Sequence, residues 1–237
     1  MFRMLAVLAL LTIAAACDEV VSTSAPTSTG PAPAASGVPD QLLTRDQTGR
    51  AFAAIVARVE PVAERECRAR TSGVNCDFRI LVDDRPNQPA NAFQTLDENK
   101  RPIIVFTIAL LDEARNADEI AFVMGHEAAH HVAGHIARQQ QNAAAGAVIF
   151  SGLASITGAD VTSAQRIGAQ VGARSYSKDF ELEADALGTV IAARSGYDPV
   201  RGSQFFNRIP DPGDRFLGTH PPNAQRIEVV RRTAAGL

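Results

Sequence analysis

Along residues 40–70 the hydrophobic positions recur every three or four residues. This spacing places them on one side of a helix, so the pattern predicts a long amphipathic helix with its apolar side against a core. Pro61 removes a backbone hydrogen bond within this stretch, and we expect a kink there. The positions that carry the pattern are Leu43, Phe52, Ile55, Val56, Val59 and Val62.

Three short runs with strand-like composition follow this helix. Residues 77–82 and 102–106 are rich in β-branched and aromatic side chains, and residues 91–93 form another candidate strand between prolines. Helical spacing returns from Ala117, with Asn116 as the expected N-cap. The order of elements predicts an α+β fold, mainly helical, with a small mixed sheet beside the helix that begins near Ala117.

The stretch at residues 139–172 is rich in alanine, glycine and serine and contains several large apolar side chains. It could form a hydrophobic hairpin, a lid or a segment that touches a membrane. The composition favours a pair of small-residue helices that pack closely.

The N-terminus has the pattern of an export signal. One positive charge, Arg3, precedes an apolar run at residues 5–16 that is too short to span a bilayer and has the length of a signal's hydrophobic region. The Ala-Ala-Ala-Cys ending resembles a bacterial lipoprotein signal over residues 1–17, in which Cys17 becomes the lipidated residue. An ordinary cleaved secretory signal is the alternative.

Residues 18–40 lack the bulky apolar side chains that a core needs. Their serine, threonine, alanine and proline content predicts a flexible tether in front of a domain at residues 41–237. This layout predicts a protein anchored through Cys17 to a membrane of the bacterial envelope and facing the periplasm. Asp18, directly after the cysteine, favours the inner membrane.

The charge of the chain restricts its possible partners, and its cysteines suggest a covalent link. The net charge is −3 and no basic tract is present, which speaks against nucleic acid as a partner. In an exported chain Cys67 and Cys76 would meet an oxidising compartment, where a disulfide between them is expected. Two free thiols are the alternative.

Four of the five histidines lie in the sequence GHEAAHHVAGH, at residues 125–135. His126 and His130 are four residues apart, so on a helix they project from one face and can bind one metal ion. Glu127 can reach a water at that metal without being a ligand. The spacing H-E-x-x-H is therefore typical of a zinc peptidase with two histidine ligands and a glutamate as general base. On a continuous helix His131 and His135 point elsewhere, and we expect both to have structural roles.

A third ligand is expected from an acidic pair further along the chain. Glu181 and Asp185 are four residues apart at the start of another helical pattern and share one face. Glu181 would bind the metal and Asp185 would orient one of the histidine ligands by a hydrogen bond. Acidic clusters of this kind also occur as solvated helix faces, which is the alternative.

These motifs together resemble the M48 family of zinc metallopeptidases over residues 47–232. The stretches that carry the resemblance are Asn91-Ala92-Phe93, residues 103–111, the GHEAAHHVAGH segment, the glutamate-x-x-x-aspartate at Glu181 and Asp185, and Thr219-His220-Pro221. The resemblance implies a zincin-like fold, Glu181 as third zinc ligand and Asp185 as its supporting residue. It also points to an exported branch of the family that acts in quality control of envelope proteins.

The resemblance further assigns candidate roles around the metal. His220 would approach the zinc and keep the enzyme latent, or bind the oxyanion; a surface position is the alternative. A peptide substrate would add to the edge strand at Asn91, Ala92 and Phe93. Arg226 could serve either the substrate or the structure.

The predicted function is a zinc-dependent endopeptidase with one Zn²⁺ per chain that cleaves misfolded or unassembled envelope proteins. The rival is a membrane-tethered chaperone or scaffold with a structural or latent zinc site, in which His220 would be a fourth ligand. Glu127 argues for catalysis, because a structural site has no need of a general base.

Overall fold

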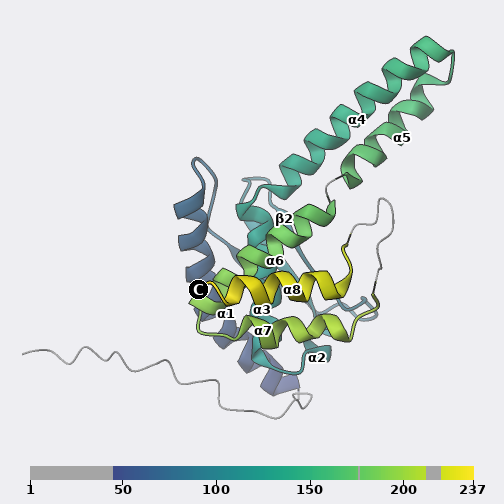
Figure 1. Cartoon of the computed structure of the whole chain (residues 1–237). Helices are drawn as coiled ribbons and strands as arrows, with labels where there is room; N and C mark the ends of the chain where they lie inside the picture. The colour runs from purple at the N-terminus through teal and green to yellow at the C-terminus, as the bar shows by residue number, and fades with distance from the viewer. Residues whose placement is uncertain (1–44, 176, 212–219) are drawn as a thin grey trace, which may run out of the picture. The chain divides into compact units, whose positions relative to one another are not determined.

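The helix with the H-E-x-x-H pattern, α3 (Ala117–Val132), lies among the other long helices and beside a small sheet in the computed structural model (Figure 1). The structure describes residues 45–175, 177–211 and 220–237. The predicted signal, the lipidation site Cys17, Asp18 and the tether lie outside these residues. All the described residues belong to one compact unit, Ala35–Leu237.

The sheet has three strands: β1 (Arg79–Asp83), β2 (Ala92–Leu96) and β3 (Pro102–Thr107). Their order is β1-β3-β2, with β1 parallel and β2 antiparallel to the central strand. The predicted α+β fold, mainly helical with a small mixed sheet beside the motif helix, is confirmed. Strand β2 pairs with β3 alone within this sheet and is therefore one of its two edge strands.

Helix α1 (Arg45–Arg70) packs against α3, and helix α2 (Ile108–Glu113) packs against β3. The amphipathic helix predicted at residues 40–70 is confirmed from residue 45, and it continues through Pro61. Asn116 caps α3 as predicted, because its side chain accepts a hydrogen bond from the backbone N–H of Glu119. The largest buried apolar side chains of this core include Ile55, Val59, Phe78, Ile104, Phe106 and Met124.

The chain turns sharply after α3. Gly134 has a φ of 66°, in the left-handed region that favours glycine, and the next helix, α4 (His135–Thr157), begins directly after it. The expectation that His135 points away from the motif histidines assumed a continuous helix, and this assumption does not hold. The turn changes the direction in which the His135 side chain projects.

Helices α4 and α5 (Val161–Arg174) lie side by side as an antiparallel hairpin (Figure 1). A methyl group added at Gly146 would lie 2.1 Å from the carbonyl oxygen of Gly168, and one added at Gly172 would lie 2.0 Å from that of Asn142. The predicted pair of closely packed small-residue helices is confirmed. The exposed large apolar side chains of this hairpin are Val148, Ile149, Leu153, Ile156, Val161 and Ile167. Within the described part of the chain, no helix combines the length and the apolar character needed to span a bilayer.

The remaining helices return the chain to α3. They are α6 (Ser177–Arg194), α7 (Pro199–Gly202), the short 3₁₀ helix η1 (Ser203–Asn207) and α8 (Asn223–Ala234). Helices α3 and α6 cross at Gly125 and Gly188. A methyl group at Gly188 would lie 2.8 Å from the backbone nitrogen of His126, which is too close for a side chain. The close approach of the two helices therefore requires glycine at both positions.

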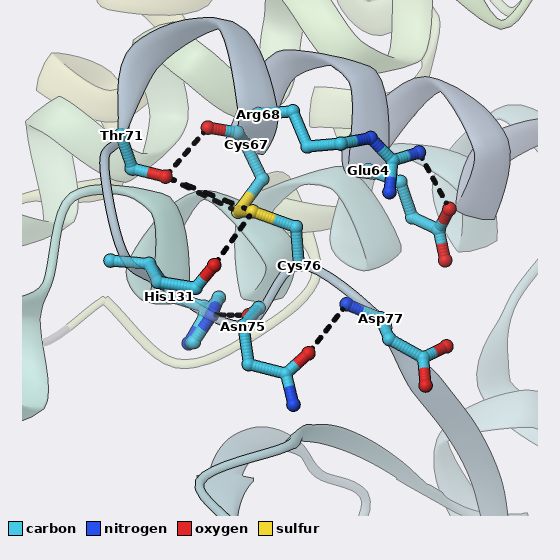
Figure 2. The surroundings of a disulfide bond; sticks show 9 residues. Glu64, Cys67, Arg68, Thr71, Asn75, Cys76, Asp77 and His131 are labelled. Atoms are coloured by element: carbon cyan, nitrogen blue, oxygen red, sulfur yellow. Dashed lines mark hydrogen bonds and ion pairs between the residues drawn. A yellow bond between two sulfur atoms is a disulfide. The ribbon is translucent and has the colours of Figure 1, made fainter.

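A disulfide joins Cys67, near the end of α1, to Cys76, just before β1 (Figure 2). The two Cα atoms are 5.7 Å apart, within the range that suits such a bridge. In the loop that the bridge closes, the carbonyl of Asn75 accepts a hydrogen bond of 2.7 Å from Nε2 of His131 on α3. The loop is thereby held against the motif helix.

Replacing both Cys67 and Cys76 with serine is expected to lower the free energy of unfolding by about 2–3 kcal/mol, because the bridge restricts a short loop in the unfolded chain. Urea denaturation of the wild-type and double-variant proteins at one fixed zinc concentration measures this difference. Intact mass with and without reductant provides the control. Two free thiols in the purified exported protein would contradict the bridge.

Candidate metal centre

Three side chains converge at the contact between α3 and α6. Nε2 of His126 lies 3.0 Å from Nε2 of His130 and 3.5 Å from a carboxylate oxygen of Glu181, while Nε2 of His130 lies 3.4 Å from the other oxygen. In the described part of the chain these three form a group able to hold a metal ion. Donors bound to one tetrahedral zinc at about 2.0–2.1 Å lie about 3.3 Å from each other, so the spacing of this group fits zinc.

A buried ion pair supports the first of these histidines. Nδ1 of His126 lies 2.9 Å from a carboxylate oxygen of Asp185, which is fully buried. Arg226, from α8, donates to both oxygens of Asp185 at 2.7 Å, and its guanidinium lies 3.9 Å above the ring of Phe206. Arg226 thus fixes the carboxylate of Asp185, and this carboxylate fixes the orientation of the His126 ring. Such support is common for metal-binding histidines.

The electrostatics of this group suit a cation. Burial alone would lower the pKa of His126, but its hydrogen bonds to Asp185 and Glu181 outweigh burial and raise it to about 10. Burial would likewise raise the pKa of Glu181, but hydrogen bonds from three histidines hold it well below its usual value. The carboxylates therefore stay ionised and attract either a proton or a metal ion to the histidine nitrogens.

Glu127 lies next to the group without joining it. Its side chain is buried, and burial raises the pKa of its carboxyl group. A raised pKa makes this carboxylate a stronger base.

Glu127 and the three convergent side chains line a cleft of about 710 Å³. Asn91, Ala92 and Phe93, at the start of strand β2, lie on its wall, as do His220 and Arg226. The structure thus places every sequence-predicted catalytic, metal-binding and substrate-binding candidate on this cleft. The supporting residue Asp185 lies behind it.

His220 reaches the group from the residues just before α8. Its Nδ1 lies 3.2 Å from an oxygen of Glu181, and more than half of its side chain remains exposed. The guanidinium of Arg226 lies 3.3 Å from the same oxygen. His220 and Arg226 thus both contact the carboxylate of the candidate ligand Glu181.

The main feature that the sequence did not reveal is the contact of His135. Its Nδ1 lies 2.8 Å from Nδ1 of His130, and its Nε2 lies 3.2 Å from Glu183. Burial lowers the pKa of His135 to about 4, so its ring is neutral at ordinary pH. Gly134 was the available signal, because a glycine between helical residues can end a helix.

The motif resemblance is confirmed by comparison with known proteins, because the chain matches peptidase family M48 over residues 51–234. The beta-barrel assembly-enhancing protease of Yersinia pestis is 29% identical over 182 residues, which cover 70% of this chain and 36% of that protein. The protein of the same name from Escherichia coli (strain K12) is 28% identical over 164 residues, or 62% of this chain and 33% of that one.

A mitochondrial relative gives a similar match. The mitochondrial metalloendopeptidase OMA1 of Arabidopsis thaliana is 30% identical over 157 residues, which cover 65% of this chain and 31% of that protein. The chain thus spans about a third of the length of these relatives. The family match covers most of the chain and includes both ligand-bearing helices, so the chain belongs to peptidase family M48.

Proposed function

We propose that this chain is a zinc-dependent endopeptidase in which His126, His130 and Glu181 hold one Zn²⁺. The single observation that carries the proposal is the convergence of these three donors, at the spacing of a tetrahedral site, in a cleft that also contains Glu127. Three protein ligands leave one position open, as catalytic zinc sites require. When bound, the zinc would polarise the scissile carbonyl and lower the pKa of the attacking water.

Glu127 acts as the general base and then as the acid. It takes a proton from the attacking water and later delivers it to the leaving amine. Its burial in the cleft supports this role, since a carboxylate with a raised pKa both accepts and returns a proton more readily near neutral pH. Asp185 and Arg226 hold His126 in place.

The substrate is an extended polypeptide that adds to strand β2. The edge of β2 opposite β3 is unpaired within the sheet, and Asn91, Ala92 and Phe93 lie on the wall of the metal cleft. Backbone hydrogen bonds to such an edge bind a peptide with little regard to its side chains. This mode suits an enzyme that acts on many unfolded or unassembled chains.

The site of action is the bacterial envelope. The expected signal at residues 1–17, lipidation at Cys17 and the tether at residues 18–40 would hold the catalytic domain close to a membrane on the periplasmic side. The relatives named for beta-barrel assembly support substrates among envelope proteins.

We further infer that His220 keeps the enzyme latent. Its hydrogen bond to Glu181 holds the ring against one of the proposed ligands, where it would hinder access to a bound metal. The rival function, a tethered chaperone or scaffold with a four-ligand structural site, would need His220 to join the ligands. The candidate group contains His126, His130 and Glu181 but not His220.

Casein hydrolysis tests the proposal. Purified wild-type protein should contain one zinc per chain, lose cleavage on chelation and regain it with stoichiometric zinc. Alanine at His126 or Glu181 should abolish both zinc binding and cleavage. His220→Ala should cleave faster than wild type. Slower cleavage by that variant would indicate an oxyanion role, and bound zinc without cleavage by either protein would favour the scaffold.

A further inference from the structure

The two histidines of the ligand group are supported in different ways. His126 meets the carboxylate of Asp185 directly at its Nδ1. The Nδ1 of His130 instead meets another imidazole, that of His135, at 2.8 Å. No role in the proposed reaction described so far accounts for His135, although it is only 4% exposed and touches a proposed ligand.

The positions of the ring nitrogens show that His135 is not itself a ligand. The group converges on Nε2 of His130, and His135 contacts the opposite nitrogen of that ring. His135 therefore lies behind His130 as seen from the metal position, where it can act on the metal only through His130.

The hydrogen bonds that link Glu183, His135 and His130 allow one consistent assignment of donors and acceptors. The carboxylate of Glu183 can only accept, so Nε2 of His135, at 3.2 Å, must donate to it. A neutral imidazole carries one N–H, so Nδ1 of His135 is then an acceptor. Nδ1 of His130 must supply the proton between the two rings, which leaves the lone pair of its Nε2 free for the metal.

Other contacts hold His135 in this orientation. Its ring stacks on Phe180 with centroids 4.6 Å apart and an interplanar angle of 12°. Arg138 covers Phe180 from 4.3 Å and donates to Glu183 at 2.7 Å. The left-handed turn at Gly134 places His135 beside His130 rather than further around one helix.

We propose that His135, oriented by Glu183, is a positioning residue that selects the metal-binding tautomer of His130 and fixes the angle of its ring. The proposal rests on the proposed zinc site. In the usual arrangement a metal-binding histidine donates a hydrogen bond directly to a carboxylate. Here the imidazole of His135 lies between the two, so that Nδ1 of His130 carries the proton and Glu183 carries the negative charge.

Two substitutions at His135 separate this role from simple packing. His135→Phe keeps an aromatic ring against Phe180 but offers no acceptor to His130. His135→Gln loses the ring but offers a carbonyl oxygen as acceptor. Competition with a chromophoric chelator gives the zinc dissociation constant of each variant, and thermal unfolding of the metal-free proteins gives their stability.

We expect His135→Phe to weaken zinc binding about 10–100-fold, the usual range for a lost supporting partner. His135→Gln should recover most of this affinity, even where its metal-free stability is lower. His131→Phe, a change at the neighbouring histidine that faces Asn75, should leave zinc affinity unchanged. In the cobalt-substituted proteins the visible absorption bands should shift for His135→Phe and not for His131→Phe.

A second measurement observes the proton directly. In the zinc-loaded wild type, long-range proton–nitrogen spectra of the histidine rings should show His130 protonated at Nδ1 and His135 protonated at Nε2. Equal zinc affinity for wild type and His135→Phe, or a His135 protonated at Nδ1, would overturn the proposal. Absence of zinc binding by the wild type would instead refute the proposed function on which it rests.

Discussion

Replacing Glu127 with glutamine is expected to lower kcat/KM for peptide hydrolysis by about 10²–10⁴-fold, the usual contribution of a general base. Glutamine has nearly the same shape as glutamate but cannot accept a proton at neutral pH. Because Glu127 lies beside the ligand group without belonging to it, zinc content should stay at one per chain. Single-turnover cleavage of a fluorogenic peptide, with metal analysis of the same sample, measures both quantities.

Glu228→Gln is the matched control. It makes the same chemical change at an exposed glutamate on α8 that does not line the cleft. Cleavage by this variant should stay within a factor of two or three of wild type. Undiminished cleavage by Glu127→Gln would remove Glu127 from the proposed mechanism, and loss of zinc from that variant would assign it a ligand role instead.

Gly188→Ala is expected to disturb the arrangement of the proposed ligands His126, His130 and Glu181, although Gly188 is not itself a ligand. The added methyl would lie 2.8 Å from the backbone nitrogen of His126 and 2.9 Å from its Cα, and backbone atoms cannot move aside as a flexible side chain can. Helix α6 must then shift away from α3 and carry Glu181 with it. We expect the free energy of unfolding to fall by about 1–3 kcal/mol and zinc affinity to weaken with it.

Gly152→Ala makes the same substitution where there is space. Gly152 lies inside helix α4, and apart from its chain neighbours and the helix's own backbone no heavy atom lies within 4 Å of the position that its methyl would take. This control should stabilise the protein by up to about 1 kcal/mol through helix propensity and leave zinc binding unchanged. Chelator competition and urea denaturation measure both variants. If Gly188→Ala bound zinc as tightly as Gly152→Ala, the close approach would not set the geometry of the site.

Local patterns predicted the elements of the site well. The helical spacing around His126 and His130 and the N-cap at Asn116 were visible because both depend on residues a few positions apart. The strand expected at residues 91–93 is instead Ala92–Leu96, because its bounds follow from pairing with β3 rather than from its own composition.

Long-range contacts could not be predicted in the same way. Arg226 binds Asp185 across two helices, and nothing in the spacing of α8 distinguishes that arginine from its neighbours. His135 was misplaced because a helical wheel assumes an unbroken helix, and one left-handed glycine invalidates that assumption. Both residues touch proposed ligands through tertiary contacts, which local sequence patterns do not encode.

In the sequence the α4–α5 hairpin lies between the two helices that carry the proposed ligands. Its two ends lie close together. At its base Gln139 donates to the carbonyl of Ala173, and Gly172 packs on Asn142. Matched insertions or deletions in both arms would therefore change how far the hairpin's apolar end extends while leaving its two ends in place. The length of the hairpin can therefore change in evolution without moving the side chains proposed to bind the metal.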